Sequence, residues 1–305
     1  METQPLAPSV KESVRTLLTG AIDYAGLFPP SAVSMPEAVL NYATYRNSNY
    51  SWMLGRFVVA ASRLSEFLDA ARDFISHDDG DAWRVAVVAG EDIIETIRQI
   101  EAFNRINDSG AICDVLEVRA NSSSKIRNTV SSLPEGVTAY FEVHMGEVMP
   151  DLIADLAILG QCAKIRTGGV TTDAFPTPAE IIRFVRTCLA ANVPFKATAG
   201  LHHPIRCFRA LTYEEESAMG TMHGFLNLFL MTGFAREGYR PSLLEHVMEE
   251  EFAEVFGFED KAVKWHSDHR LNIFQIQALR EKGVQSFGSC SFDEPVADLQ
   301  RLGIL

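Results

Sequence analysis

Short apolar runs alternate with amphipathic helical segments along this 305-residue chain, and that alternation restricts the fold more than any other feature. Runs such as GRFVVAAS at 55–62 and WRVAVVAG at 83–90 are apolar on both faces, as buried parallel strands are. Each run is followed by a segment with helical spacing, and the last unit is GVQSFGSCS at 283–291 with the helix after it. Eight such units predict an α/β fold, a closed (β/α)8 TIM barrel, with residues 1–305 as a single domain.

One segment interrupts the alternation. Residues 210–283, between the seventh and eighth expected strands, have the spacing of several helices. An insertion after a barrel strand emerges at the carboxyl-terminal face, where barrel active sites lie. We therefore expect a helical insertion that is either a lid over the site or a contact between subunits of a homo-oligomer.

Composition narrows the classes of partner. A net charge of −13 argues against nucleic acid and anionic membranes, and the apolar run at 224–234 is too short to span a bilayer. The first residues lack the pattern of a signal peptide, and the five cysteines form no CxxC pair, so we expect reduced thiols and a cytoplasmic protein. No GxGxxG motif follows the first strand. The expected partner is a small-molecule substrate, and we expect no cofactor.

Charged side chains recur toward the carboxyl ends of four successive expected strands. Alternate residues of a barrel strand face inward, and charged side chains are rarely buried unless they are paired. Two explanations are open: a structural salt-bridge network at the barrel mouth, or an active site, which we favour. The residues are Asp114 (or Glu117 and Arg119, depending on where the strand bends), Glu142 and His144, Lys164 and Arg166, and Lys196 and Thr198.

Two of these residues, Lys164 and Lys196, are lysines on neighbouring expected strands. A second cation nearby disfavours a charged ammonium group, so that a neutral amine becomes available near neutral pH. A neutral lysine amine attacks a carbonyl carbon and forms a Schiff base, which then serves as an electron sink when a carbon–carbon bond breaks or forms. The pair predicts Schiff-base chemistry in which nearby carboxylates move the protons.

Three stretches carry a resemblance to a known family: 140–169, which ends in CAKIRTGG, 177–200, which ends in VPFKATAG, and 287–303, which begins FGSCS. They resemble the class I deoxyribose-phosphate aldolase family of Schiff-base barrels. The similarity covers most of residues 14–209 and 284–305 and leaves out the insertion. It implies a lyase that works through an imine on lysine.

The resemblance also implies roles for individual residues. Lys164 corresponds to the lysine that forms the Schiff base, and Lys196 to the second lysine, which makes the first more nucleophilic. Asp114 corresponds to an aspartate that helps to relay protons. The turns that hold the sugar phosphate in that family correspond to Gly168, Gly169, Gly200, Gly288 and Ser291.

The sequence departs from the family pattern around the substrate. Leu201, followed by His202 and His203, stands where the family has a second glycine, and Arg166 replaces a small hydroxyl residue. The family's carboxyl-terminal tyrosine has no counterpart. We therefore expect a small anionic carbonyl compound other than deoxyribose 5-phosphate, bound by Arg119 and Arg166 through bidentate contacts. The two histidines replace the phosphate turn or act as acid and base.

Two further residues are open to more than one interpretation. Asp23, at the end of the first expected strand, either contacts the substrate or fixes the adjacent loop. Cys290 stands where the family has a serine. Because the sequence places no base clearly beside this thiol, we do not expect a nucleophile there.

Two other functions are also open. Glu142, His144, His202 and His203 could supply ligands to a zinc or manganese ion in a metal-dependent barrel enzyme. Alternatively, the altered phosphate turns and the missing tyrosine favour a barrel that has lost catalysis and serves as a binding or scaffold protein. The two retained lysines oppose that second possibility, since buried ammonium groups without partners destabilise a fold.

Overall fold

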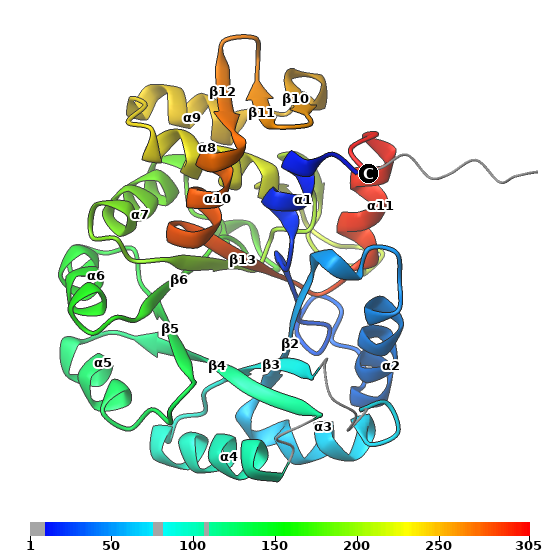
Figure 1. Cartoon of the computed structure of the whole chain (residues 1–305), viewed down its shortest axis with the longest axis vertical. Helices are drawn as coiled ribbons and strands as arrows, with labels where there is room; N and C mark the ends of the chain where they lie inside the picture. The colour runs from blue at the N-terminus through cyan, green and yellow to red at the C-terminus, as the bar shows by residue number, and fades with distance from the viewer. Residues whose placement is uncertain (1–9, 76–81, 107–109) are drawn as a thin grey trace, which may run out of the picture.

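The computed structural model describes residues 10–75, 82–106 and 110–305, and it contains a closed barrel of eight parallel strands (Figure 1). Around the barrel the strand order is β1-β13-β7-β6-β5-β4-β3-β2, so the chain winds around once and the last strand closes against the first. The predicted (β/α)8 TIM barrel is confirmed. Its strands are β1 (Ile22–Tyr24), β2 (Leu54–Ala60), β3 (Trp83–Val88), β4 (Ala111–Ala120), β5 (Thr138–Val143), β6 (Cys162–Arg166), β7 (Phe195–Thr198) and β13 (Val284–Ser289).

A ring of helices covers the outside of the barrel, one after each strand (Figure 1). Local sequence fixes where they begin: Thr177 and Glu180 form a reciprocal capping box, in which each side chain accepts a hydrogen bond from the other's backbone N–H. A further helix, α1 (Glu12–Leu18), precedes the first strand. The ring consists of α2 (Met35–Arg46), α3 (Leu64–Ala71), α4 (Ile93–Ile106), α5 (Ser123–Val130), α6 (Met149–Ile158), α7 (Pro178–Ala190), α8 (Phe225–Arg236) and α11 (Asp293–Arg301).

The apolar core lies mainly between the barrel and this ring. Outward-facing strand residues such as Phe57, Phe141 and Ile165 are fully buried there, each contributing about 2 kcal/mol by leaving water. Inside the barrel the apolar cluster is much smaller and consists of Val58, Ala86, Val115, Tyr140 and Cys162. The remaining interior positions toward the carboxyl ends of the strands are therefore available to charged side chains.

The segment predicted as a helical insertion contains the three expected helices, α8, α9 (Pro241–Glu249) and α10 (Ile273–Lys282), but it also contains strands. The first of these helices, α8, begins at Phe225. The strands are β8 (Cys207–Ala210) and β9 (Met219–Met222), which form a hairpin, and β10 (Phe256–Glu259), β11 (Ala262–Trp265) and β12 (His269–Asn272), which form an antiparallel sheet. Each of these five strands is only four residues long, which is too short to show an alternating pattern.

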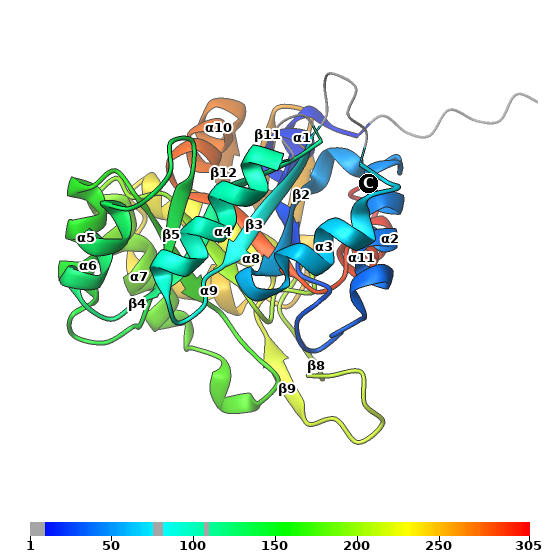
Figure 2. The same cartoon turned by 90° about the horizontal axis from the view of Figure 1, so that it is seen from below.

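The two parts of this segment lie at opposite ends of the barrel (Figure 2). The β8–β9 hairpin projects from the carboxyl-terminal face. The three-stranded sheet lies beside α1 at the amino-terminal end, where Ser13 N donates to Asp260 O at 2.7 Å. The expectation of a lid can therefore apply only to the hairpin, because α8 belongs to the outer ring of helices and the three-stranded sheet lies at the opposite end of the barrel.

Two further features concern the whole described chain. Among the helices of residues 10–75, 82–106 and 110–305, none is both long and apolar enough to cross a membrane. All five cysteines are free thiols, and Cys207 is the least buried of them.

Candidate active site

A cavity of about 610 Å³ opens at the carboxyl-terminal end of the barrel. Its floor and walls come from the ends of the strands and from the loops that follow them, as in other barrels. Charged residues from three consecutive strands line it: Glu117 and Arg119 of β4, Glu142 of β5, and Lys164 and Arg166 of β6. The predicted cluster of charges at the barrel mouth therefore surrounds a space large enough for a small molecule.

Lys164 is the lysine at the cavity wall. Its Nζ lies 2.7 Å from Glu117 Oε2 and 2.9 Å from Glu142 Oε2. The residue is buried, whereas the side chain of Glu142 is 17% exposed. Lys164 therefore meets the cavity between two carboxylates, of which Glu142 is the more accessible.

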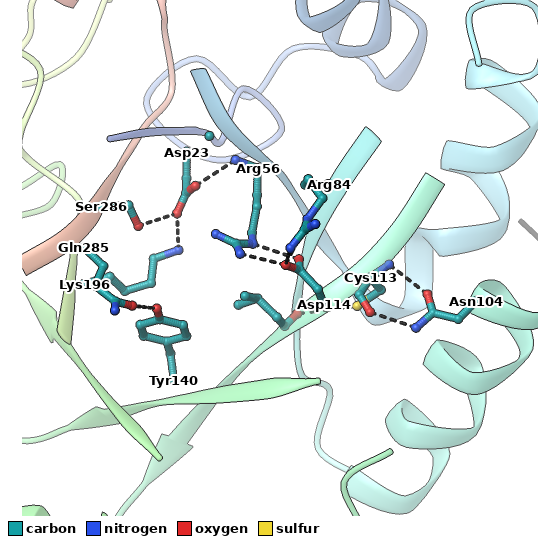
Figure 3. Close-up of polar contacts among 12 residues, drawn as sticks. Asp23, Arg56, Arg84, Asn104, Cys113, Asp114, Tyr140, Lys196, Gln285 and Ser286 are labelled. Atoms are coloured by element: carbon teal, nitrogen blue, oxygen red, sulfur yellow. Dashed lines mark hydrogen bonds and ion pairs between the residues drawn. The ribbon is translucent and has the colours of Figure 1, made fainter. Parts of the chain in front are cut away.

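Lys196 lies beneath Lys164, on the adjacent strand, and is only 2% exposed. Its Nζ donates to Asp23 Oδ2 at 2.6 Å and to Glu117 Oε1 at 2.5 Å. Burial disfavours the ammonium form, but Asp23 and Glu117 together outweigh it and raise the pKa of Lys196. Ser286 Oγ donates to the same oxygen of Asp23 at 2.8 Å (Figure 3). Asp23 is thus a partner of Lys196 inside the barrel and does not line the cavity.

Glu117 connects the two lysines, because each of its carboxylate oxygens binds one ammonium group. Burial opposes its negative charge, but the two lysines outweigh that effect and lower the pKa of Glu117 to about 2. With Asp23 and Glu142, the cluster holds three carboxylates and two ammonium groups. The nearest partners of both lysines are therefore carboxylates, and neither ammonium group has the other as its nearest charged neighbour.

A bulge in β4 turns Glu117 toward the lysines. Val85 pairs with Cys113 and Ala86 pairs with Val115, so Asp114 is an extra residue in β4. The backbone N–H and C=O of Cys113 both bind the Asn104 side chain at 2.8 Å, which satisfies the groups that a bulge leaves without a strand partner (Figure 3).

Asp114, the expected proton relay, lies near the amino-terminal end of the barrel. It accepts hydrogen bonds from Arg56 Nε at 2.8 Å and Arg56 Nη2 at 2.7 Å, and also from Arg84 (Figure 3). Burial raises the pKa of Asp114, but the two arginines reverse that effect and lower it. The structure thus brings Glu117 to the lysines and leaves Asp114 in a separate ion pair.

Three cations surround the cavity mouth: Arg119, Arg166 and Lys125. Arg119 Nε lies 3.6 Å from Glu142 Oε1, and Arg166 Nε donates to Gly168 O at 3.1 Å. Both arginines are exposed, so their remaining N–H groups face solvent or cavity. Such a rim suits an anionic group, and the binding of one by the two arginines stays a prediction.

The residues expected to form phosphate turns, four glycines and Ser291, do not all lie at the cavity. Gly169, Gly200 and Gly288 line the cavity. Gly168 is buried beside Gly200: a Cβ on Gly168 would come within 2.9 Å of Gly200 Cα, and Gly200 has a φ of +74°. Both positions therefore require glycine. Ser291 does not line the cavity, and its Oγ accepts from Glu294 N at the start of α11.

The histidines are not brought together as the metal hypothesis requires. β5 ends at Val143, so His144 does not continue the alternation from Glu142 and is exposed. His202 lines the cavity, whereas His203 Nδ1 lies 2.6 Å from Asp298 Oδ2. Within the described parts of the chain, no three His, Cys, Asp or Glu residues are arranged so that they could hold a metal ion.

The sequence places no base clearly beside Cys290, but the structure places His202 there. Its Sγ lies 3.6 Å from His202 Nδ1, and both residues line the cavity. They are far apart in sequence, but β7, which precedes His202, pairs with β13, which precedes Cys290. The order of strands in a barrel, in which the seventh and eighth are neighbours, was the signal that could have found this pair.

Comparison with known proteins adds little to this geometry. No family model matches the sequence. Among solved structures, nitroalkane oxidase from Streptomyces ansochromogenes aligns with a TM-score of 0.33 and 13% sequence identity over 63% of this chain and 62% of the oxidase. The chain therefore spans less than two thirds of that structure, and no property of the oxidase is carried over.

Proposed function

We propose that the protein is a Schiff-base lyase of the aldolase type, which acts on a small anionic carbonyl compound through Lys164. One observation carries this proposal: Lys164 lines the cavity between Glu117 and Glu142. A nucleophilic amine, a proton acceptor and a space for substrate are thus adjacent, which is what imine chemistry requires.

Glu142 is the residue best placed to move protons. Lys164 must lose a proton before it attacks, and Glu142, 2.9 Å away and partly exposed to the cavity, accepts it. The free amine adds to the carbonyl carbon, and Glu142 returns the proton to the departing hydroxyl as water leaves. The resulting iminium takes up the electron pair of the breaking carbon–carbon bond while Glu142, again a carboxylate, accepts the proton of the β-hydroxyl group. Glu142 then gives this proton to the enamine carbon, and water adds to the regenerated iminium, which releases the carbonyl product and restores the amine of Lys164.

Glu117 and Lys196 support this step from inside the barrel. Lys196 binds one oxygen of Glu117 and so fixes the other oxygen of that carboxylate against Lys164 at the cavity wall. Lys196 is 2% exposed and does not touch the cavity, so it is a positioning residue. This role replaces direct repulsion between the two lysines, which the sequence argument assumed.

The rim favours an anionic substrate. Arg119, Arg166 and Lys125 stand at the mouth, and guanidinium groups form bidentate contacts with carboxylate or phosphate. A substrate held there by its anionic end would place a carbonyl group deeper in the cavity, toward Lys164. Pyruvate and dihydroxyacetone phosphate are suitable probes of this class.

Hydrogen exchange tests the proposal. An enzyme that forms an iminium loses and regains α-protons, so deuterium from D₂O should enter pyruvate or dihydroxyacetone phosphate faster than without protein. Lys164→Met should abolish the exchange, as followed by proton NMR. Exchange that persists in folded Lys164→Met would show that the chemistry does not pass through this lysine.

A further inference from the structure

Cys290 and His202 form a second polar pair in the cavity, on the side of β7 and β13. The Sγ–Nδ1 distance of 3.6 Å is within the range of a hydrogen bond to sulfur. Both residues are buried in the fold but line the cavity. A small molecule that reaches Lys164 can therefore also reach this thiol.

Two further side chains hold the pair in place. Glu294 Oε2, in the first turn of α11, lies 3.6 Å from His202 Nδ1. Tyr213, from the loop of the β8–β9 hairpin, donates to Glu294 Oε2 at 3.1 Å and lies 3.7 Å from Cys290 Sγ. The four residues thus form a closed cluster that links the hairpin to the barrel.

The cluster separates two cavities. A second cavity of about 350 Å³ lies under the hairpin and is lined by His202, Tyr213 and Glu294, together with apolar residues of the two hairpin strands. His202 also lines the barrel cavity, so its ring stands in the wall between the two spaces. Cys290 lines the barrel cavity, on the same side of this wall as Lys164, and is not among the residues that line the second cavity.

The surroundings favour a thiolate at Cys290. Burial opposes its charge, but a hydrogen bond and the charge of His202, together with hydrogen bonds from Ser31 and Tyr213, outweigh it and lower the pKa of Cys290. The reciprocal effect raises the pKa of His202 against burial. Glu294, Tyr213, Tyr24 and Tyr45 also act on the pair, and Arg209 and His203 line the adjacent cavity, but His202 is the positively charged group whose contact with Cys290 Sγ the described residues show. His202 is therefore the cation that holds the thiolate.

The other cysteines have the opposite character. Burial raises the pKa values of Cys113, Cys162, Cys188 and Cys207. Cys207 is more accessible than Cys290 and has no histidine beside it among the interactions that the structure shows in the described residues. It is therefore a matched internal control for reactivity.

We propose that Cys290 and His202 form a thiolate–imidazolium pair that binds small aldehydes reversibly as thiohemiacetals. The Cys290 thiolate attacks the carbonyl carbon and forms a carbon–sulfur bond, while the electron pair of the C=O bond moves to oxygen. The His202 imidazolium gives its proton to that oxygen, so the adduct and the ring are both neutral. Reversal restores the ion pair, and no oxidant or leaving group is needed.

This inference is independent of the imine at Lys164. Alkylation by iodoacetamide, followed by peptide mass analysis, measures the reactivity of each cysteine across pH. Cys290 should react before Cys207, with a midpoint below that of an ordinary thiol, about 8.5. His202→Gln should raise the midpoint and slow alkylation of Cys290 at pH 7 by about tenfold. Tyr213→Phe, which leaves the histidine in place, should have a smaller effect.

Acetaldehyde supplies the second arm of the test. It should slow the alkylation of Cys290 reversibly, in the wild type and equally in Lys164→Met. If acetaldehyde no longer protects Cys290 from alkylation in Lys164→Met, the aldehyde binds to the lysine, and the proposed thiohemiacetal is overturned. Alkylation of Cys290 no faster than that of Cys207, or a pH midpoint unchanged in folded His202→Gln, would overturn the ion pair.

Discussion

Lys164 and Lys196 are register partners on adjacent strands, and they share one carboxylate, that of Glu117. Breaking such a buried arrangement costs more than a surface ion pair contributes, because the partners left behind remain desolvated. The cluster is thus important for stability as well as for the proposed chemistry, and the two roles can be separated by experiment.

Glu117→Gln removes the shared charge while keeping the shape of the side chain. We expect the free energy of unfolding at pH 7 to fall by about 3 kcal/mol, since both lysines lose a partner. The lowered pKa of Glu117, about 2, means that its stabilisation is present above the ordinary glutamate pKa. It is lost as the pH falls from about 4.3, the ordinary value, toward 2.

Urea unfolding of both proteins at pH 7, 5 and 3 measures this difference. The difference in the free energy of unfolding between wild type and Glu117→Gln should be constant from pH 7 to pH 5 and should become smaller at pH 3. Glu101→Gln, on the exposed face of α4, is the matched control. A difference that does not change between pH 7 and pH 3 would contradict the charge on Glu117.

Lys196→Met tests the positioning role. Without Lys196, Glu117 loses the partner that fixes its carboxylate against Lys164, so imine formation at Lys164 should slow by about tenfold or more near neutral pH. The raised pKa of Lys196 also means that its stabilisation is complete below the ordinary lysine pKa and is lost only as the pH rises through the raised value. Trapping rates from pH 6 to 10 measure the first effect. An unchanged rate and pH profile in folded Lys196→Met would leave the residue without this role.

Arg166→Gln tests recognition of an anionic substrate at the rim. Loss of a charge-assisted contact should raise the half-saturating concentration of pyruvate by about tenfold or more, with no effect on neutral acetaldehyde. Arg186→Gln, on the exposed side of α7, controls for the change in net charge. An equal rise in the half-saturating concentrations of pyruvate and acetaldehyde would mean that Arg166 supports the fold of the loop and not the binding of an anion.

Asp114→Asn tests whether Asp114 relays protons, as the resemblance implies, or only stabilises the fold through its pairs with Arg56 and Arg84. Because Asp114 pairs with Arg56 and Arg84 away from the cavity, its loss should lower the free energy of unfolding by about 2 kcal/mol at pH 7. Trapping at Lys164 should keep its wild-type rate. A large loss of trapping in a variant that unfolds like the wild type would instead support the proton relay.

The fold could be predicted because each strand–helix unit carries its own signal. Buried parallel strands such as β2 are apolar on both faces, and the helices between them have regular spacing. The hairpin and the three-stranded sheet of the insertion escaped prediction because their strands are four residues long. Such strands gain stability from tertiary packing, which the sequence pattern does not display.

The site could be predicted in part for similar reasons. Alternation within β6 and β7 is enough to place Lys164 and Lys196 inside the barrel. The choice between Asp114 and Glu117 depends on a bulge, which reverses the inward-facing positions of a strand and leaves no clear mark in the sequence. His144 was misplaced because β5 ends one residue earlier, at Val143.

Borohydride trapping shows whether Lys164 forms the imine. The protein is incubated with pyruvate, dihydroxyacetone phosphate or acetaldehyde, reduced, and mapped by peptide mass. We predict one substrate-sized adduct, on the peptide that contains Lys164, which is absent in Lys164→Ala and retained in Lys264→Ala. Folded protein that gives no adduct with any of these compounds, or an adduct that persists in Lys164→Ala, would contradict the account.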